Sequence, residues 1–427
     1  MNKMDLINEL HQRNLIFHIT NKNKLKELIK NKCISLYCGF DPTGESLHVG
    51  HLLPLITLKR FQILGHKPIV LIGGATSLIG DPSFKTKERL LQSDNLIDKW
   101  TLKISQQVSF FLDFNCNFNS ALILNNNSWF KKINVLSFLR DVGKHFSINT
   151  MINREAVKQR IKRLDQGISF TEFSYNLLQA YDFFILNQKN QVSLQIGGSD
   201  QWGNISSGMH LIHRTSKKEV YGLTLPLLIQ SNGIKFGKTE SGTVWLDPKK
   251  TTPYKFYQFW MNIEDSNVYR FLKLFTFMNI DEVNQREKNK YKNNQIIFDK
   301  SLLAKYITRL VHGDENLSAA ERITNILFFK NIEDIKESDL EQLKKDGIPA
   351  IEVYKIKDLQ EALVFSSLAK SRTQAKNMII SNSISINTKK IVNKNHIINN
   401  NDKLFDKFTL LSRGKKNHCL IYWKNKI

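Results

Sequence analysis

The distribution of apolar and polar positions divides the chain into regions of different structure. From about residue 36 to residue 228, short apolar runs bounded by glycine alternate with longer segments of helical periodicity. The runs are typical of buried strands, and the longer segments are typical of helices. The predicted strands are SLYCGF, KPIVLIGG and VSLQIGG, and the predicted helices are LPLITLKRFQILG and SYNLLQAYDFFIL. Strands that alternate with helices predict a doubly wound, parallel α/β sheet.

Downstream the pattern changes twice. From about Thr251 it becomes helical and aromatic, and TTPYKFYQFW opens this region with threonine caps and a proline near the first turn. The charged stretch KNIEDIKESDLEQLKKDG predicts its end and a linker, and the chain beyond Lys357 is small and basic. We therefore expect an α/β domain with an insertion over 1–230, a loop and helical domain over 231–335, a linker over 336–356 and a small α+β domain over 357–427.

The charge balance favours a polyanionic partner. The 427 residues include 62 lysines and arginines against 39 acidic residues, a formal net charge of +23. Such a field attracts nucleic acid. Part of the excess reflects a general drift toward lysine, asparagine and isoleucine, as in NKNKLKELIKNK and NKNHIINNN. The charge therefore indicates RNA or DNA binding only in combination with a site.

Other features predict a cytoplasmic protein without a structural metal. No window approaches the roughly 18 to 20 unbroken apolar residues of a membrane span. Charges interrupt the N-terminal MNKMDLINELHQRNLIF where a signal peptide has its apolar core. The cysteines contain no CxxC pair, which is typical of reduced thiols and not of a disulfide framework or a zinc site. They are Cys33, Cys38, Cys116 and Cys419.

The stretch YCGFDPTGESLHVGH, residues 37–51, places two histidines where a strand passes into a helix. The predicted strand SLYCGF ends here, and open α/β sheets bind ligands at the carboxyl ends of their strands. Ser46 is the predicted N-cap of a helix that starts at Leu47. His48 and His51 then share one face of its first turn, where backbone N–H groups and the helix dipole favour phosphate. The arrangement suits a nucleotide whose phosphate is attacked.

Two neighbouring residues qualify this prediction. Gly50 is expected to let a base or ribose approach the backbone closely. Pro54 is expected inside the helix, where it would free the Gly50 carbonyl and bend the helix. The chain contains neither GxxxxGK[ST] nor GxGxxG, so those phosphate loops are excluded. Alone, an HxGH sequence fits a histidine-bearing surface helix better than a site.

A second basic motif, KFGKT at residues 235–239, lies in the glycine-flanked segment NGIKFGKTESG. Lys235 and Lys238 are three apart in a predicted mobile loop, and their charge suits a polyphosphate leaving group. Alone, this motif would be one more basic turn of a basic protein. Together and in this order, HVGH and KFGKT resemble the HIGH and KMSKS elements of the class I aminoacyl-tRNA synthetases.

Within that class, the chain resembles the bacterial tyrosyl-tRNA synthetases. The matching strings are YCGFDPT, GGATSLIGDPS, YNLLQAYDF, GGSDQWGN and KFGKT, in family order and over essentially the whole chain. The tryptophanyl enzymes, which share the fold and several elements, are the nearest alternative. The resemblance implies a Rossmann-like catalytic domain, an α-helical domain on the anticodon side and a C-terminal RNA-binding domain.

The same resemblance implies an ATP-dependent ligase. It would activate L-tyrosine with Mg²⁺-ATP to tyrosyl-adenylate and pyrophosphate, and would then transfer tyrosine to the 3′-terminal adenosine of tRNA(Tyr). Catalysis would rest on positioning and electrostatics and not on a protein nucleophile. A homodimer is also implied, with the interface near GKHFSIN.

A tyrosine substrate can be tested against the residues themselves. In YNLLQAYD, three polar residues occupy one stripe of a predicted helix: Tyr175, Gln179 and Asp182. Asp182 can accept a hydrogen bond from a phenol hydroxyl, and Tyr37, at the end of the first predicted strand, can donate one. Either tyrosine alone would be interpreted as an ordinary residue of the hydrophobic core. An aspartate amid AYDFFIL needs a partner.

The resemblance assigns roles to further residues. Asp81, Tyr175 and Gln179 would hold the substrate ammonium. Thr43 and His48 would contact the γ-phosphate, while His51, with Gly50, would lie nearer the ribose. Those expected to line the ribose and the reacting carboxylate are Gly39, Asp41, Gly198, Asp200 and Gln201. Those expected to clamp the pyrophosphate are Lys85, Arg89, Lys235, Lys238 and Thr239.

The C-terminal region is similar to a small RNA-binding module first named from a ribosomal small-subunit protein. DLQEALVFSSLAKS and SRTQAKNMIISN predict two short helices, with Ser371 as a cap, and SISINTKKIV predicts a strand, a turn and a strand. Asn382 stands where the family usually has glycine and can adopt the left-handed conformation in its place. The expected RNA-binding residues are Lys370, Arg372 and Lys376, with Lys389 and Lys390 in the hairpin turn.

Two other classes stay open at this point. A small-molecule nucleotidyltransferase can carry an HxGH sequence at a helix start, but such enzymes are generally shorter and lack the KFGKT partner. A catalytically retired RNA-binding protein could keep the same scaffold. The presence of both histidines and both loop lysines argues against it, because a retired site would be free to lose them.

Overall fold

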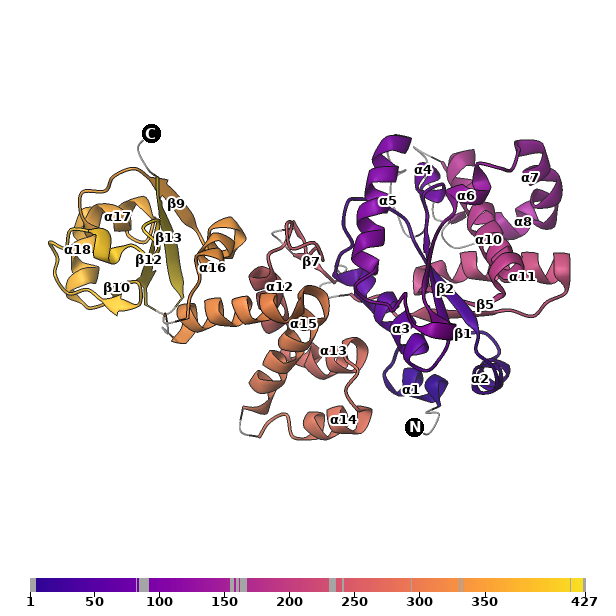
Figure 1. The fold of residues 1–427 in the computed structure, drawn as a ribbon, viewed down its shortest axis with the longest axis horizontal. Helices are drawn as coiled ribbons and strands as arrows, with labels where there is room; N and C mark the ends of the chain where they lie inside the picture. Colours follow the sequence, from indigo (N-terminus) through magenta and orange to yellow (C-terminus); the bar gives the residue numbers. More distant parts are fainter. Residues whose placement is uncertain are drawn as a thin grey trace. The chain divides into compact units, whose positions relative to one another are not determined.

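The computed structural model describes residues 5–81, 83, 92–153, 157–158, 161, 167–229, 236–239, 242–292, 294–329, 332, 334–414 and 416–424. The chain forms two compact units (Figure 1). The first comprises Met1–Leu246 and Tyr269–Asn289, and the second comprises Asp247–Val268 and Lys290–Ile427. The segment Tyr269–Asn289 thus belongs to the first unit, although the sequence around it is helical and aromatic. The domain boundaries expected above stay a prediction.

The first unit is built on a six-stranded sheet with the order β1-β6-β5-β2-β3-β4. All neighbours pair in parallel except β1, which is antiparallel to β6. The strands are β1 His18–Ile19, β2 Ser35–Phe40, β3 Lys67–Ile72, β4 Leu122–Asn125, β5 Val192–Gly198 and β6 Tyr221–Leu225. The predicted doubly wound sheet is confirmed, and the three predicted strands are β2, β3 and β5.

The strand order places a switch point between β2 and β5. From β2 the chain adds β3 and β4 on one side, and it then returns to add β5 and β6 on the other. Connections from β2 and β5 therefore diverge at their carboxyl ends, and such a divergence opens a crevice in doubly wound sheets. A hydrophobic core beneath it joins the sheet to one long helix, since Tyr37, Ile69 and Val192 pack with Phe183 and Leu186.

Helices accompany the strands of this unit. The two predicted helices correspond to α3 and α10. The bounds are α1 Leu6–Gln12, α2 Lys22–Asn31, α3 Leu52–Ile63, α4 Thr76–Ile79, α5 Asp94–Val108, α6 Asn127–Phe130, α7 Val135–Asp141, α8 Ile148–Ile152, α10 Phe170–Asn190, α11 Trp202–Ser216, α13 Val268–Phe275 and α14 Ile280–Lys288. A two-stranded ladder, β7 Lys238–Thr239 with β8 Gly242–Thr243, completes the unit.

The second unit begins with helices. They are α12 Pro253–Met261, α15 Gln295–Thr324 and α16 Glu337–Gln342. As predicted, a threonine caps the first of them: the Thr252 side chain accepts from the Lys255 N–H, and Pro253 follows in the first turn. α12 packs along α15, which is broken at Gly313 (φ 80°). An ion pair of 2.8 Å joins Arg322 of α15 to Asp339 of α16.

The C-terminal part of the same unit is a five-stranded sheet with two helices. Its order is β11-β10-β12-β13-β9, and β9 joins β13 in parallel, so the segment expected as a linker carries a strand of this sheet. The predicted helices, the Ser371 cap and the left-handed Asn382 (φ 58°) are confirmed. The bounds are β9 Ala350–Val353, α17 Leu359–Phe365, α18 Arg372–Ile380, β10 Ile384–Ile386, β11 Lys389–Lys390, β12 Phe408–Arg413 and β13 Asn417–Trp423.

Candidate active site

A cavity of about 510 Å³ opens at the switch point of the sheet. Its lining comes from the ends of β2 and β5, the turn before α3, and the middle of α10. The volume is within the range of small-ligand sites. Most of the described residues predicted for the site line this one cavity: Tyr37, Gly39, Asp41, Thr43, His48, Gly50, His51, Asp81, Tyr175, Gln179, Asp182, Gly198, Asp200 and Gln201.

The HVGH segment differs from its prediction in one respect. A single 3₁₀ turn, Val49–His51, precedes α3, and its N-cap is His48. Ser46 is not a cap: its hydroxyl donates to the Leu47 carbonyl at 2.7 Å and shares a contact with Gln107. The prediction that the helix starts at Leu47 with Ser46 as its cap was therefore wrong. Histidine replaces serine as the cap because its ring nitrogen can accept from the backbone in the same way.

The two histidine rings are fixed by backbone hydrogen bonds. The Gly50 N–H donates to His48 Nδ1 at 3.1 Å, and the His48 N–H donates to His51 Nδ1 at 3.1 Å. Because both Nδ1 atoms accept, a neutral ring must carry its proton on Nε2. Burial holds the pKa of His51 well below its ordinary value, and the neighbouring His48 lowers it further. Nε2 is therefore the donor of each ring, and such donors suit phosphate or ribose oxygens.

The structure shows further features of Gly50 and Pro54 beyond those expected. A Cβ on Gly50 would meet the His48 ring at 2.9 Å, so the glycine makes room for the histidine cap. Pro54 is the third residue of α3, whose cap is His51. Its missing N–H belongs to the first turn, where no intrahelical partner exists. The 3₁₀ turn Val49–His51 runs directly into α3, so the freed Gly50 carbonyl and the bend stay predictions.

At the other end of the cavity, Asp182 is held from two sides. The Trp129 indole N–H donates to Asp182 Oδ1 at 2.8 Å, and the Asn126 amide donates to Oδ2 at 3.1 Å. Burial raises the pKa of Asp182 to about 8, and the two donors act against that rise. The sequence analysis missed both donors. Asn126 and Trp129 follow closely after β4, and β4 was itself not predicted from the sequence.

A hydrogen-bonded chain continues from this carboxylate toward the sheet edge. Asn126 also donates to the Thr76 hydroxyl at 3.0 Å, which donates to Asp41 Oδ1 at 2.8 Å. The Tyr175 hydroxyl donates to the other oxygen of Asp41, again at 2.8 Å. Tyr175 thus contacts Asp41 here, and its expected contact with an ammonium stays a prediction. Burial and the nearby carboxylates raise the pKa of Tyr175, which keeps it a donor.

A second carboxylate group lies across the cavity. The Gln201 amide donates to Asp81 Oδ2 at 2.8 Å, and the Asn204 amide donates to Gln201 Oε1 at 3.1 Å. Gln201 follows β5, in the 3₁₀ turn Ser199–Gln201. The structure thus brings together Asp81 and Gln201, two residues 120 positions apart that the sequence analysis had assigned to one substrate.

Three polar atoms of the cavity are buried and receive no hydrogen bond from the described part of the chain. They are the Tyr37 hydroxyl and the side-chain oxygens of Gln179 and Gln195. Buried polar groups are satisfied in most native proteins, so atoms of this kind beside a cavity indicate where ligand groups bind. Gln195 was missed by the sequence analysis, although a glutamine inside the apolar strand VSLQIGG is a visible signal.

The KFGKT segment lies directly on the HVGH turn. The Val49 N–H donates to the Val244 carbonyl at 3.1 Å, and the Val244 N–H donates to the Gly237 carbonyl at 2.8 Å. Gly237 has a φ of 87°, and a Cβ on it would meet Val49 at 3.3 Å. Lys238 and Thr239 form β7, so this part is a short ladder and not the predicted loop. Lys85, Arg89 and Lys235 lie outside the described residues.

The expected RNA-binding residues lie on the surface of the C-terminal part, with all five side chains exposed. Arg372 forms an ion pair with Asp358, and the Lys390 ammonium donates to the Asn382 carbonyl. Lys389 and Lys390 form β11 directly after the turn, so their placement in the turn itself was wrong. Among the described residues there is no group of three His, Cys, Asp or Glu that could hold a metal, and no helix long and apolar enough to cross a membrane.

Comparison with known families decides the assignment. The family model for class I tRNA synthetases (W and Y) matches residues 30–329, and that for the SYY-like C-terminal domain of tyrosine–tRNA ligase matches residues 339–421. The tyrosine–tRNA ligase of Buchnera aphidicola subsp. Schizaphis graminum is 87% identical over 98% of this chain and 100% of its own length. That of Klebsiella pneumoniae is 55% identical over 99% of both chains.

The chain belongs to the tyrosine–tRNA ligases, a family of class I aminoacyl-tRNA synthetases. Among solved structures, a truncated mitochondrial tyrosyl-tRNA synthetase of Aspergillus nidulans is similar with a TM-score of 0.68 at 30% identity, over 76% of this chain and 94% of its own. The tryptophanyl-tRNA synthetase of Plasmodium falciparum, at 14% identity and a TM-score of 0.53, shares the fold alone. The predicted family, the tyrosine–tRNA ligases, and the predicted fold class are confirmed. The tryptophanyl and nucleotidyltransferase alternatives are not supported.

Proposed function

We propose that the cavity binds L-tyrosine and Mg²⁺-ATP, forms tyrosyl-adenylate and pyrophosphate, and passes tyrosine to the terminal adenosine of tRNA(Tyr). The observation that carries the proposal is the pairing of the unsatisfied Tyr37 hydroxyl with the Asp182 carboxylate in one buried cavity. A phenol hydroxyl placed between them donates to Asp182 and accepts from Tyr37. An apolar ring would leave the Tyr37 hydroxyl unpaired, at a cost of about 1–3 kcal/mol, and would deprive Asp182 of a third donor beside Trp129 and Asn126.

The other groups of the cavity suit the rest of the reactants. Asp81 and Gln179 provide oxygens for an ammonium, together with Tyr175. We assign the ribose to the sheet edge with Asp41 and Asp200 and to His51, and the γ-phosphate to Thr43 and the Nε2 donor of His48. Lys85, Arg89, Lys235, Lys238 and Thr239 are proposed to clamp the leaving pyrophosphate on the basis of the family motif. In-line attack of the tyrosine carboxylate on the α-phosphorus then needs no protein nucleophile.

The exposed lysines of the C-terminal part and the net charge of +23 support contact with tRNA. A homodimer is supported by an apolar surface around the predicted GKHFSIN segment. α7 has no buried residue, and Leu136 (79% exposed) and Ile148 (64%) are among the large apolar side chains left on this surface. Single-chain proteins rarely expose such patches without a partner. We place the protein in the cytoplasm.

The test is amino-acid-dependent exchange of pyrophosphate into ATP, measured with tyrosine and with tryptophan, followed by charging of tRNA. Exchange with tyrosine alone supports the proposal, and exchange with tryptophan contradicts it. A chain truncated after Gly347, which removes β9 together with the sheet it belongs to, should keep the exchange and lose most tRNA charging. Unchanged charging would remove RNA binding from the C-terminal part.

A further inference from the structure

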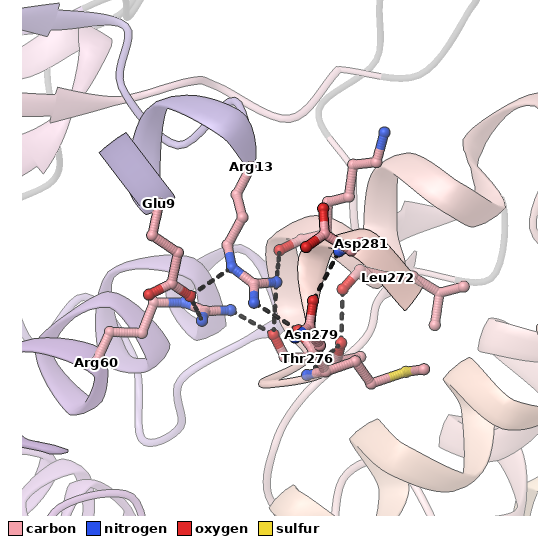
Figure 2. Close-up of polar contacts among 9 residues, drawn as sticks. Glu9, Arg13, Arg60, Leu272, Thr276, Asn279 and Asp281 are labelled. Atoms are coloured by element: carbon pink, nitrogen blue, oxygen red, sulfur yellow. Dashed lines mark hydrogen bonds and ion pairs between the residues drawn. The ribbon is translucent and has the colours of Figure 1, made fainter. Parts of the chain in front are cut away.

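A buried cluster of charges lies in the first unit, away from the cavity. Glu9 of α1 accepts from Arg13 Nε at 2.7 Å and from Arg60 Nη1 at 3.1 Å (Figure 2). The side chains of Arg13 and Arg60 are only 2% and 3% exposed. One carboxylate thus faces two guanidinium groups, and burial of the second positive charge requires further acceptors.

Those acceptors are the backbone carbonyls at the end of α13. Arg13 donates to the carbonyls of Lys273 (3.1 Å) and Thr276 (3.3 Å) and to that of Met278, and Arg60 donates to the Thr276 carbonyl. The Arg60 guanidinium also lies 4.7 Å from the Phe277 ring centroid. The last carbonyls of a helix lack intrahelical partners and carry its negative dipole end, so guanidinium forks suit them. Figure 2 shows both arginines converging on this helix end.

The cluster connects the two signature motifs through packed elements. Arg60 lies on α3, the helix that follows directly from the HVGH turn. α13, whose end the arginines hold, carries Phe271, and the ring of Phe271 packs on Phe236 with centroids 4.6 Å apart. Phe236 stands inside KFGKT and lines the cavity. A continuous path of contacts therefore runs from α3 through α13 to the KFGKT ladder.

We propose that the Glu9–Arg13–Arg60 cluster positions the KFGKT ladder against the HVGH turn by fixing α13. Arg13 and Arg60 are positioning residues, and neither lines the cavity. Backbone hydrogen bonds join the HVGH turn to the chain after the ladder, from Val49 to Val244 and from Leu246 to Leu47, and Phe271 supplies an apolar wall behind Phe236. Displacement of α13 would move that wall, and the donors of KFGKT would move with it. The catalytic consequence rests on the function proposed above, while the structural consequence does not.

Hydrogen exchange on the full-length protein tests the inference independently of activity. The informative amides are those of Phe236, which donates to the Leu228 carbonyl at 2.8 Å, and of Val244. In Arg60→Met and in Phe271→Ala, exchange at both amides should be faster by roughly 3- to 30-fold, the range of coupling through packed networks. Arg60→Lys keeps the charge without the fork and should fall between wild type and Arg60→Met. Amides of β3 serve as the internal reference.

Val283→Ala is the matched control. Val283 is buried in α14, within the same Tyr269–Asn289 segment, and takes part in none of the hydrogen bonds described for the cluster. This variant should lower the melting temperature and leave exchange at Phe236 and Val244 unchanged. If Arg60→Met speeds exchange only near the end of α13, and Arg60→Lys does the same, the cluster merely anchors that segment and the proposal is overturned.

A kinetic measurement adds the functional consequence. In Arg60→Met and Phe271→Ala, the KM for ATP in pyrophosphate exchange should rise by roughly 3- to 30-fold, with the KM for tyrosine within twofold of wild type. Equal changes in both constants would contradict a positioning role for KFGKT. If the wild-type protein gives no tyrosine-dependent exchange, the proposed function fails, and the hydrogen-exchange result still decides the role of the cluster.

Discussion

The two ends of the cavity, called the tyrosine end and the nucleotide end after the reactants proposed for them, are built in different ways. The tyrosine end is formed by side chains of a central strand and a long helix, and its polar groups are buried and oriented by Asn126 and Trp129. The nucleotide end is formed by a single 3₁₀ turn and a two-stranded ladder, and its histidines are oriented by backbone N–H groups. The first arrangement favours selectivity, because a wrong ring leaves buried partners unpaired. The second favours charge handling, because the imidazole Nε2 groups are oriented donors for the oxygens of the proposed nucleotide.

The largest effect is expected at the tyrosine end. Asp182→Asn should reduce kcat/KM for tyrosine by roughly 100-fold, because the phenol loses a carboxyl acceptor and the new NH2 group faces one of the two N–H donors. The KM for ATP should stay within about threefold. The measurement is pyrophosphate exchange with each substrate varied in turn. A comparable rise in both KM values would show that the two ends are not separate.

Stability should depend on pH through the same residue. The pKa of Asp182 is raised to about 8 in the folded chain, so between about pH 4 and pH 8 the folded state keeps a proton that the unfolded state has lost. This group therefore lowers the free energy of unfolding as pH rises, by on the order of 1 kcal/mol per pH unit. Urea unfolding at pH 5.5 and 8 measures this. Between these two pH values the free energy of unfolding should decline less in Asp182→Asn than in wild type. Identical declines of the unfolding free energy in the two proteins would show that Asp182 is not a protonated carboxyl in the folded state.

At the nucleotide end, His48→Gln should reduce kcat of exchange by about tenfold and leave the KM for tyrosine unchanged. The glutamine amide can replace the Nε2 donor, but the Gly50 N–H loses its acceptor and the turn relaxes. His213→Gln, on the surface of α11, is the control and should have wild-type kinetics. A selective loss of tyrosine affinity in His48→Gln would reverse the assignment of the two ends.

A smaller effect is expected where one supporting hydrogen bond is removed. Trp129→Phe deletes the 2.8 Å bond to Asp182 and should raise the KM for tyrosine about fivefold, which corresponds to roughly 1 kcal/mol. The KM for ATP should not change. If both constants stay at their wild-type values, Asn126 alone suffices to orient the carboxylate.

The smallest effect is expected at Pro54. Because Pro54 stands in the first turn of α3, Pro54→Thr adds at most one hydrogen bond, to the Gly50 carbonyl of the preceding 3₁₀ turn. The residue lines the cavity near His51, so the KM for ATP should change by less than about threefold and still by more than that for tyrosine. A tenfold change would restore the interpretation of Pro54 as a bend.

Much of this comparison could be predicted from the sequence, for physical reasons. Apolar runs and their order predicted β2, β3, β5 and the parallel sheet, since a buried strand must be apolar on both faces. Motif order then predicted most of the cavity lining. Thr76, Asn126 and Trp129 could not be predicted, because their function depends on tertiary contacts between separate segments. The prediction of Ser46 as the N-cap was wrong because the ring of His48 caps the 3₁₀ turn Val49–His51 instead.

The charge cluster was also beyond sequence reasoning. Glu9, Arg13 and Arg60 lie in ordinary amphipathic contexts, and only the fold brings the end of α13 to them. The chain has 62 lysines and arginines, and nothing in the sequence distinguishes the two buried arginines from the others. The same excess hides which surface lysines contact RNA, and for that reason the RNA-binding residues stay a prediction.

The most direct test of the account is the ratio of kcat/KM for tyrosine to that for phenylalanine in pyrophosphate exchange by the wild-type protein. The two substrates differ only in the hydroxyl that Tyr37 and Asp182 are proposed to bind. With phenylalanine the Tyr37 hydroxyl has no partner and Asp182 loses one of three donors, which predicts a preference for tyrosine of at least about 100-fold. A ratio within about threefold would mean that the buried pair does not read the hydroxyl, and would contradict the central claim.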